Sequence, residues 1–96
     1  MTTDIDEDFF YVTNSLRRMD VMYVLGSVDF ARNGEIADIL CTRPAYVSTI
    51  TRELAEHGLL DAKKSEKYKI YSLSEKGQQI VQKLKAYHGI EWEWHV

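Results

Sequence analysis

Several residue types are scarce in this sequence, and each shortage excludes a class of protein. The 96 residues include one cysteine, Cys41, so no internal disulfide can form. That fits a reducing cytoplasm, and a disulfide to a second chain is the alternative. No apolar run approaches the roughly 18 residues that a membrane-spanning helix needs. The beginning, MTTDIDEDFF, has neither the basic segment nor the long apolar segment of a signal or transit peptide. We therefore expect a cytoplasmic protein that does not enter a membrane.

Proline and glycine are also scarce, with one proline at Pro44 and five glycines. The chain has no low-complexity linker and no internal repeat, so one domain is expected. Its 45% hydrophobic and 28% charged residues are typical of a globular fold. We find no glycine-rich phosphate loop, no nucleophile–base pair and no pair of acids suited to catalysis. The sequence therefore predicts neither an enzyme nor a cofactor.

Positive charge is in slight deficit, with a formal net charge of -3. The deficit arises in the first eight residues, which hold no base and four acids: Asp4, Asp6, Glu7 and Asp8. From Phe9 onward, basic residues outnumber acidic ones by one. Local patches rather than net charge set the affinity for phosphate. The acidity therefore does not exclude a nucleic-acid partner, and residues 1–8 are expected as an acidic segment that need not be ordered.

Apolar spacings of three and four residues predict an amphipathic helix over residues 9–25. Gly26 is expected to stop this helix, and Asn14 or Ser15 is an alternative cap for a later start. The following residues, VDFAR, suffice for one short strand. Asn33 is then expected to cap a second helix, GEIADIL.

A third helix is expected over residues 43–57. Thr42 would be its N-cap, Pro44 would lie in its first turn, and Gly58 would end it. The period changes to two over LLDAKKSEKYKIYSLS, which predicts a β-hairpin with its turn at KSEK. Ser74 is expected to cap a fourth helix, EKGQQIVQKLKAYH. The last residues, GIEWEWHV, alternate as a strand does.

The three-residue break between the second and third helices has helix-turn-helix spacing, and the hairpin that follows would be a wing. The sequence resembles winged helix-turn-helix regulators of the MarR and ArsR types, of the small kind abundant in archaea. The resemblance rests on EIADIL, YVSTITRELAEHGLL and YKIYSLSEKGQQIV, and covers about residues 15–84. It implies a mostly α fold with a small β-hairpin wing. The winged helix-turn-helix domain would span residues 9–88, followed by an aromatic tail at 89–96.

The resemblance implies that residues 43–57 lie in the major groove of double-stranded DNA. Four residues are expected to face the core: Val47, Ile50, Thr51 and Leu54. The outward residues are then the expected DNA contacts on this helix: Arg43, Ala45, Tyr46, Ser48, Thr49 and Arg52. Relatives often carry a polar residue at position 50 and leucine at position 51, so the rotation of this helix stays open. The same outward residues also fit an ordinary solvated helix face.

The wing, residues 61–73, would lie on the DNA backbone or in a minor groove. Its expected contacts are four lysines: Lys63, Lys64, Lys67 and Lys69. Arg17, Arg18 and Arg32 are further candidates for flanking phosphates, and a solvated surface with local ion pairs explains them equally well.

Two half-sites about one DNA turn apart would roughly double the binding energy of one module, so we expect a twofold-symmetric homodimer. Surplus apolar residues at both ends form the expected interface: Phe9, Phe10, Ile80, Leu84, Tyr87, Trp92 and Trp94. The alternative is a tail that folds back on its own core.

The sequence therefore predicts a sequence-specific transcriptional regulator associated with the nucleoid. The alternative is a protein–protein or architectural module without specific DNA readout. Cysteine, histidine and glutamate residues show no recognised metal-ligand spacing, so no metal is expected: Cys41, His57, His88, Glu91, Glu93 and His95. Cys41 is expected as half-buried filler at the turn, with redox sensing as the less favoured alternative. The sequence does not identify a small-molecule effector.

Overall fold

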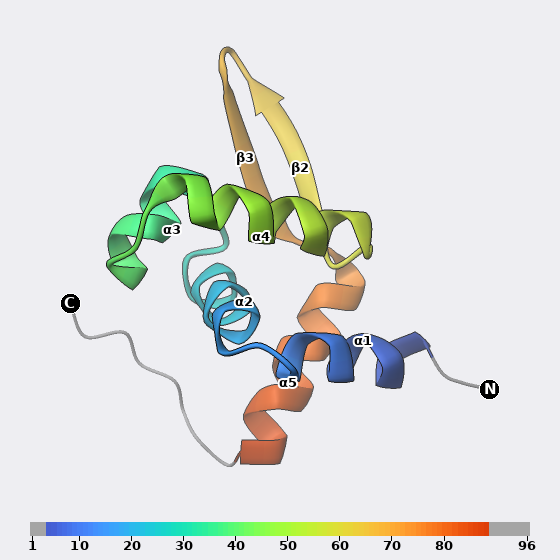
Figure 1. Ribbon diagram of the computed structural model, residues 1–96. Coiled ribbons are helices and arrows are strands. Elements are labelled where there is room, and N and C mark those ends of the chain that lie inside the picture. Colours follow the sequence, from blue (N-terminus) through green and yellow to red (C-terminus); the bar gives the residue numbers. More distant parts are fainter. Residues whose placement is uncertain (1–3, 89–96) are drawn as a thin grey trace.

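The computed structural model describes residues 4–88. The elements are α1 Asp4–Thr13, α2 Leu16–Val28, β1 Phe30–Arg32, α3 Asn33–Leu40, α4 Pro44–Glu56, β2 Leu60–Ser65, β3 Tyr68–Leu73 and α5 Glu75–His88. The strands form one antiparallel sheet in the order β1-β3-β2. The β2–β3 hairpin projects beyond the helices (Figure 1). None of the helices in this part of the chain is long and apolar enough to cross a membrane.

Helix α2 forms the centre of the core. It packs against all four other helices and against β1 and β3. The five consecutive residues Val21–Leu25 are all buried, because neighbours cover this helix on every side. Leu54 from α4 and the α5 residues Ile80 and Leu84 are also fully buried in this core. α2 is therefore a central buried helix over these residues rather than an amphipathic surface helix.

The single helix expected over residues 9–25 is wrong, because the structure has two helices there. Ser15 breaks the run with an extended backbone (φ -142°), and its Oγ accepts the Arg18 N–H at 3.3 Å. Ser15 is therefore the N-cap of α2, which was the alternative expectation. Gly26 does not stop α2, which continues to Val28. A Cβ on Gly26 would lie 3.2 Å from Val81 Cγ1, so this glycine permits close packing of α2 on α5.

Two predicted helix caps are displaced by one residue. Arg32 rather than Asn33 is the N-cap of α3, and its N–H donates to Glu35 Oε1 at 2.8 Å. Arg43 rather than Thr42 is the N-cap of α4, with Pro44 as the first helical residue. Proline can occupy that position because its missing N–H would have had no helical partner.

The predicted hairpin and last helix are confirmed. Strands β2 and β3 pair from Leu60↔Leu73 to Ser65↔Tyr68. Gly58 has a φ of 78° after α4, as its position required. Ser74 caps α5, since its Oγ accepts the Gly77 N–H at 3.0 Å and donates to the Gly58 carbonyl at 2.7 Å.

The acidic start of the chain belongs to the described fold from Asp4 onward. Residues Asp4–Asp8 form the first half of α1, although the sequence left residues 1–8 outside the domain. Asp6 Oδ1 lies 2.7 Å from Lys83 Nζ, and Asp8 Oδ2 lies 2.9 Å from Lys76 Nζ. Two of the four leading acids are therefore neutralised by lysines of α5.

Candidate nucleic-acid interface

The helix-turn-helix is made by α3, a tight turn and α4. Cys41 ends α3 in the left-handed region (φ 57°), and the Thr42 N–H returns to the Ala37 carbonyl at 2.9 Å. Asparagine or glycine is more usual at such a position. Cys41 is exposed rather than half-buried, so its expected role as packing filler is wrong.

The rotation of α4, which the sequence left open, agrees with the predicted inward set. Val47, Thr51 and Leu54 are almost entirely buried, and Ile50 is 8% exposed. The Thr51 hydroxyl lies 2.9 Å from Asn33 Oδ1 and 3.2 Å from the Ser48 carbonyl. A threonine is tolerated in this core because its hydroxyl has these acceptors.

The outward side of α4 carries the residues predicted to contact DNA. Arg43, Ala45, Tyr46, Thr49 and Arg52 are exposed, and Ser48 is half-buried. Thr49 Oγ1 lies 3.4 Å from the Ala45 carbonyl, a long contact that a base or phosphate can replace. The face therefore combines two guanidinium groups, small hydroxyls and an aromatic ring, which are suited to base edges and phosphates.

Arg17 from α2 extends this surface at the start of α4. Its guanidinium carbon lies 5.9 Å from the centroid of the Tyr46 ring, within cation–π range. Its Nη1 also lies 3.8 Å from Asp20 Oδ2. Burial raises the pKa of the Asp20 carboxyl, and the Arg17 charge opposes that rise. Arg17 and Tyr46 are thus held together, a pairing that the sequence analysis did not identify.

The other two arginines proposed for flanking phosphates have partners within the fold. Arg18 Nη1 donates to the Tyr11 carbonyl at 2.8 Å, and its guanidinium lies 3.9 Å from the Tyr11 ring centroid. The Arg32 guanidinium carbon lies 4.6 Å from the centroid of the Tyr68 ring. This contact joins the end of β1 to the start of β3, next to the hairpin turn. These contacts favour structural roles for both side chains.

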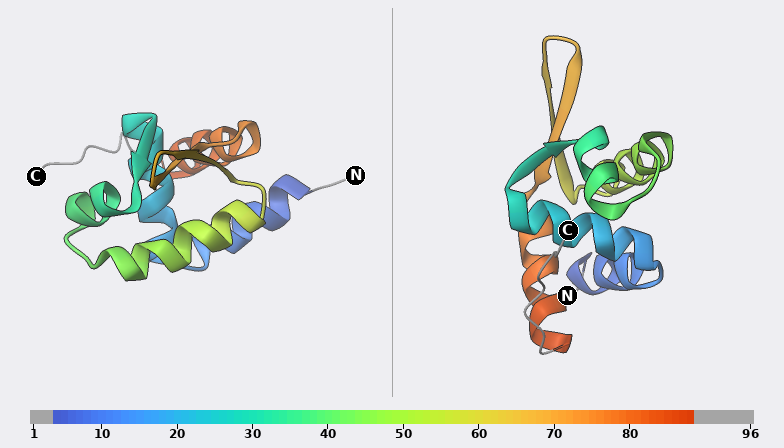
Figure 2. Two further views of the ribbon diagram at one scale, coloured as in Figure 1. Left: turned by 90° about the horizontal axis from the view of Figure 1, so that it is seen from above. Right: turned by 90° about the vertical axis from the view of Figure 1, so that its left-hand side faces the viewer.

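The wing lysines predicted to contact DNA are all exposed. Lys64 pairs directly with Lys69, whereas Lys63 pairs with Ile70 and Lys67 lies in the turn. Viewed along the wing, the hairpin stands between α4 and α5 (Figure 2). A duplex against α4 can therefore also reach the hairpin.

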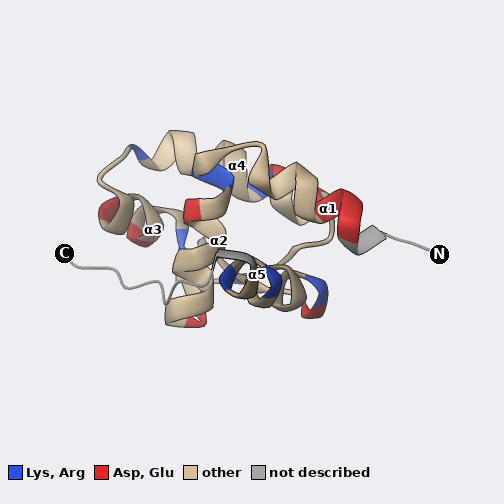
Figure 3. Cartoon of the chain, turned by 90° about the horizontal axis from the view of Figure 1, so that it is seen from below, with Lys and Arg blue, Asp and Glu red and all other residues tan. Residues whose placement is uncertain are grey.

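Asp6 and Asp8 of α1 lie beside α5, and Asp8 also lies beside the residue that ends α4. In the view from below, the acidic start of α1 and the basic residues of α5 are both visible (Figure 3). Asp8 also lies 4.0 Å from His57 Nδ1, and the His57 ring stacks on Tyr11 at 3.7 Å. Together with the two lysine pairs, these contacts join α1 to α5 and to the residue that follows α4, so Asp6 and Asp8 are not free charges.

Three residues predicted for a dimer interface are buried within the chain itself. Phe9 is 8% exposed, and Ile80 and Leu84 are fully buried, so they have no surface left for a second copy. Their apolar spacing reflects the monomer core. Phe10 is 65% exposed and remains a candidate, joined by Leu16, which is 75% exposed and was not predicted. The side chains of Tyr87, Trp92 and Trp94 lie outside the described residues.

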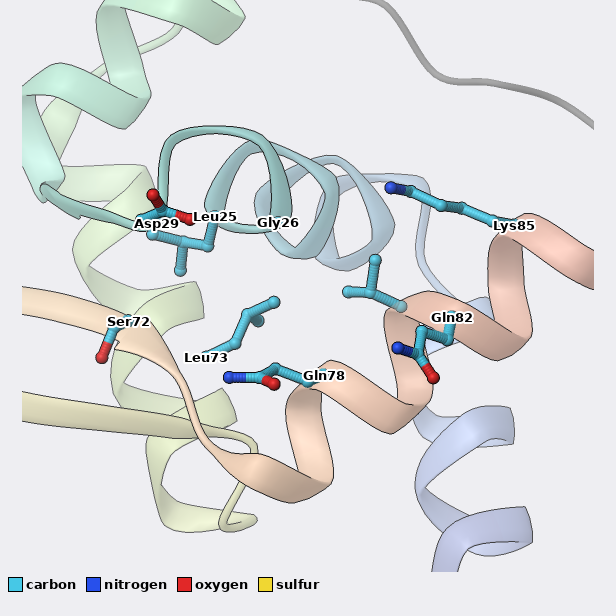
Figure 4. A pocket seen from close by; sticks show the side chains of 9 residues that line it. Leu25, Gly26, Asp29, Ser72, Leu73, Gln78, Gln82 and Lys85 are labelled. Carbon is cyan, nitrogen blue, oxygen red and sulfur yellow. The ribbon is translucent and has the colours of Figure 1, made fainter.

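One cavity of about 450 Å³ lies between α2, the end of β3 and α5. Leu25, Leu73 and Val81 are its apolar lining residues. Asp29 and Lys85 lie at opposite ends (Figure 4). No residue of α3 or α4 lines it. No group of three or more potential metal ligands is present among the described residues.

Comparison with known proteins supports the fold. No family model and no curated protein matches the chain. A mutant of the type III plasmid segregation protein TubR superposes with a TM-score of 0.80 at 20% identity, over 94% of this chain and 98% of that chain. The antimony-specific transcriptional repressor AntR gives 0.71 at 17% identity, over 84% of this chain and 75% of that one. At these identities the likeness establishes the winged helix fold alone.

Longer regulators share the same fold. The zinc-responsive MarR family member ZitR of Lactococcus lactis gives a TM-score of 0.62 at 24% identity, over 74% of this chain. This chain spans about half of ZitR, 51% of its length.

Proposed function

We propose that this chain is a sequence-specific, double-stranded DNA-binding transcriptional regulator that acts as a homodimer. The observation that carries the proposal is the arrangement of α4 and the wing. α4 buries one side in the core and presents the polar residues Tyr46, Thr49 and Arg52 on the other. A lysine-bearing hairpin stands beside it. In this fold, such a helix enters the major groove and the wing contacts the backbone.

Selection of bound fragments from random-sequence DNA tests the proposal. A palindromic motif with half-sites about one helical turn apart is expected for a symmetric dimer. Arg52→Ala is expected to weaken binding to the selected site by about 5- to 150-fold, which corresponds to the loss of one bidentate base contact. Gln79→Ala is the matched control, because Gln79 is exposed on α5 outside the α4 surface.

A steep fall of affinity with salt separates this function from the protein–protein alternative. A DNA regulator loses affinity in proportion to the phosphates that it neutralises. A scaffold without DNA readout shows no such slope, and enrichment that follows fragment length alone indicates an architectural role.

The homodimer would use exposed apolar residues near the α1–α2 junction, with Phe10 and Leu16 as its described members. Phe10→Ser combined with Leu16→Ser is expected to shift sedimentation toward the monomer. Removal of residues 89–96 tests the predicted part of the tail, and an unchanged dimer would exclude that part. Replacing Phe30, another exposed aromatic residue on β1, provides the control.

DNA binding in plasmid segregation is a second candidate. The observation that favours it is the superposition on TubR, which covers nearly the whole length of both chains. Mapping of bound sites on host and plasmid DNA distinguishes the two functions. A promoter-proximal operator supports regulation, whereas sites confined to a plasmid maintenance region support segregation.

A further inference from the structure

The strand register divides the wing lysines between two faces of the hairpin. Lys64 pairs with Lys69, and Ala62 pairs with Tyr71 on the same strands. Because side chains alternate along a strand, Lys64 and Lys69 share the face of Tyr71. Lys63 is one residue out of step and lies on the opposite face, across from Ile70.

The face that carries Lys64 and Lys69 is the one that continues into the core. Tyr71 is 3% exposed and belongs to the core that α4 also covers. The opposite face of the sheet is open to solvent, since Phe30, which pairs with Ser72, is 64% exposed. Leu60 and Ala31 lie on the same face as Tyr71 and belong to the same buried core as Val47, Ile50 and Leu54 of α4. Lys64 and Lys69 therefore lie on the face of the sheet that α4 packs against.

Lys64 and Lys69 form a like-charge pair that nothing in the hairpin offsets. Residues directly opposite in an antiparallel ladder have Cβ atoms roughly 4.5–5.5 Å apart, and like charges there destabilise the sheet. Asp61 lies on the other face, with Lys63, and Glu66 lies in the turn. Among the described residues, neither Lys64 nor Lys69 forms an ion pair.

We propose that Lys64 and Lys69 together form a phosphate site, completed by the backbone of a duplex bound to α4, and that Lys63 takes no part in it. The proposal rests on the proposed function. An anion between the two ammonium groups turns their mutual repulsion into two attractive, charge-assisted contacts. The pair therefore lowers the stability of the free wing and raises its affinity for phosphate.

Salt-dependent binding tests this assignment. We would titrate a fluorescein-labelled random-sequence duplex with the wild type, Lys64→Gln, Lys69→Gln and the matched control Lys63→Gln. Each neutralised phosphate contributes about 0.9 to the slope of log affinity against log salt. Lys64→Gln and Lys69→Gln are each expected to lower the slope by up to about 0.9. Between 50 and 200 mM salt, the wild type would then lose up to roughly three- to fourfold more affinity than either variant. Lys63→Gln leaves the slope unchanged.

Thermal unfolding without DNA at low salt supplies a second readout, which a merely solvated lysine would not affect. Lys64→Gln and Lys69→Gln are each expected to raise the melting temperature by about 1–6 °C, because the repulsion is removed. The double variant gains no more than either single variant, since one substitution already removes the pair. Lys63→Gln leaves the melting temperature unchanged or lowers it, because Asp61 shares its face.

Two outcomes distinguish the failure of the inference from the failure of the proposed function. If the wild type binds the duplex but Lys63→Gln lowers the slope as much as the other variants, or neither paired-lysine variant melts higher, the two-lysine site is wrong. If the wild type shows no salt-dependent duplex binding, the proposed function itself is wrong and the site is lost with it.

Discussion

The ion pair between Asp8 of α1 and Lys76 of α5 is expected to contribute more to stability than its neighbour between Asp6 and Lys83. The two pairs join the same helices at similar distances, 2.9 Å and 2.7 Å. They differ in burial. The side chains of Asp8 and Lys76 are 12% and 34% exposed, whereas those of Asp6 and Lys83 are 65% and 42% exposed. Asp8 Oδ2 is buried and accepts no directed hydrogen bond among the described residues, so Lys76 supplies its main compensation.

The magnitude follows from opposing terms. Two unit charges 2.9 Å apart attract by roughly 6 kcal/mol at an effective dielectric constant of 20. Desolvation of the two ions removes several kcal/mol of this, and the partial exposure of Lys76 adds solvent screening. A coupling free energy of about 1–3 kcal/mol remains for Asp8 and Lys76. For the exposed pair, Asp6 and Lys83, about 0–1 kcal/mol is expected.

Two double-mutant cycles measured by urea unfolding test this difference. Lys76→Met is expected to destabilise the protein by about 2–3 kcal/mol, because it leaves the buried Asp8 carboxylate without its partner. The variant that combines Asp8→Asn with Lys76→Met should cost less than the sum of the single changes. The second cycle uses Asp6→Asn and Lys83→Met as the matched control. Equal coupling energies in the two cycles would refute the reasoning from burial.

Four further substitutions probe the core and the helices. Gly77→Ala is expected to lower the free energy of unfolding by at least about 2 kcal/mol, because its Cβ would lie 2.1 Å from the Leu59 carbonyl oxygen. A Cβ on Gly34 would meet nothing within 4 Å, so Gly34→Ala should stabilise α3 by about 0.5–1 kcal/mol. Chemical unfolding measures both changes. Asp20→Asn should be more stable than the wild type at pH 7, because burial raises the pKa of this carboxyl in the folded state. The wild type then loses stability as pH rises through the carboxyl range, so the difference should shrink on acidification, and a constant difference would contradict this account. Thr51→Val should lower stability by about 0.5–1.5 kcal/mol through loss of its hydrogen bond to α3. An unchanged midpoint of urea unfolding would show that this hydrogen bond adds no net stability.

Local chemistry made the second half of the fold predictable. Pro44 and Gly58 mark the two ends of α4, and the change of period after Gly58 marks the hairpin, since backbone preferences act within a few residues. The buried side of α4 also followed from spacing, even though Thr51 occupies a core position. The predicted helix starts were less accurate, because a neighbouring residue can take the N-cap position, as Arg32 and Arg43 do.

Apolar spacing did not distinguish the monomer core from a partner surface. Phe9, Ile80 and Leu84 have the periodicity expected of an interface, yet α1, α2 and α5 bury them within one chain. Phe10, the next residue after Phe9, remains exposed. The pattern of a helix shows which side is apolar, and only the packing of other elements shows what covers that side.

The winged helix architecture, the outward residues of α4 and the lysine-rich hairpin could all be predicted from the amino-acid pattern. These properties depend on periodicity, caps and turns, which are local. The tertiary structure alone decided that α1 is separate from α2, that its acids pair with α5, and that Lys64 and Lys69 share one face while Lys63 lies on the other. Those properties depend on strand register and on contacts between residues far apart in the chain, which no local pattern specifies.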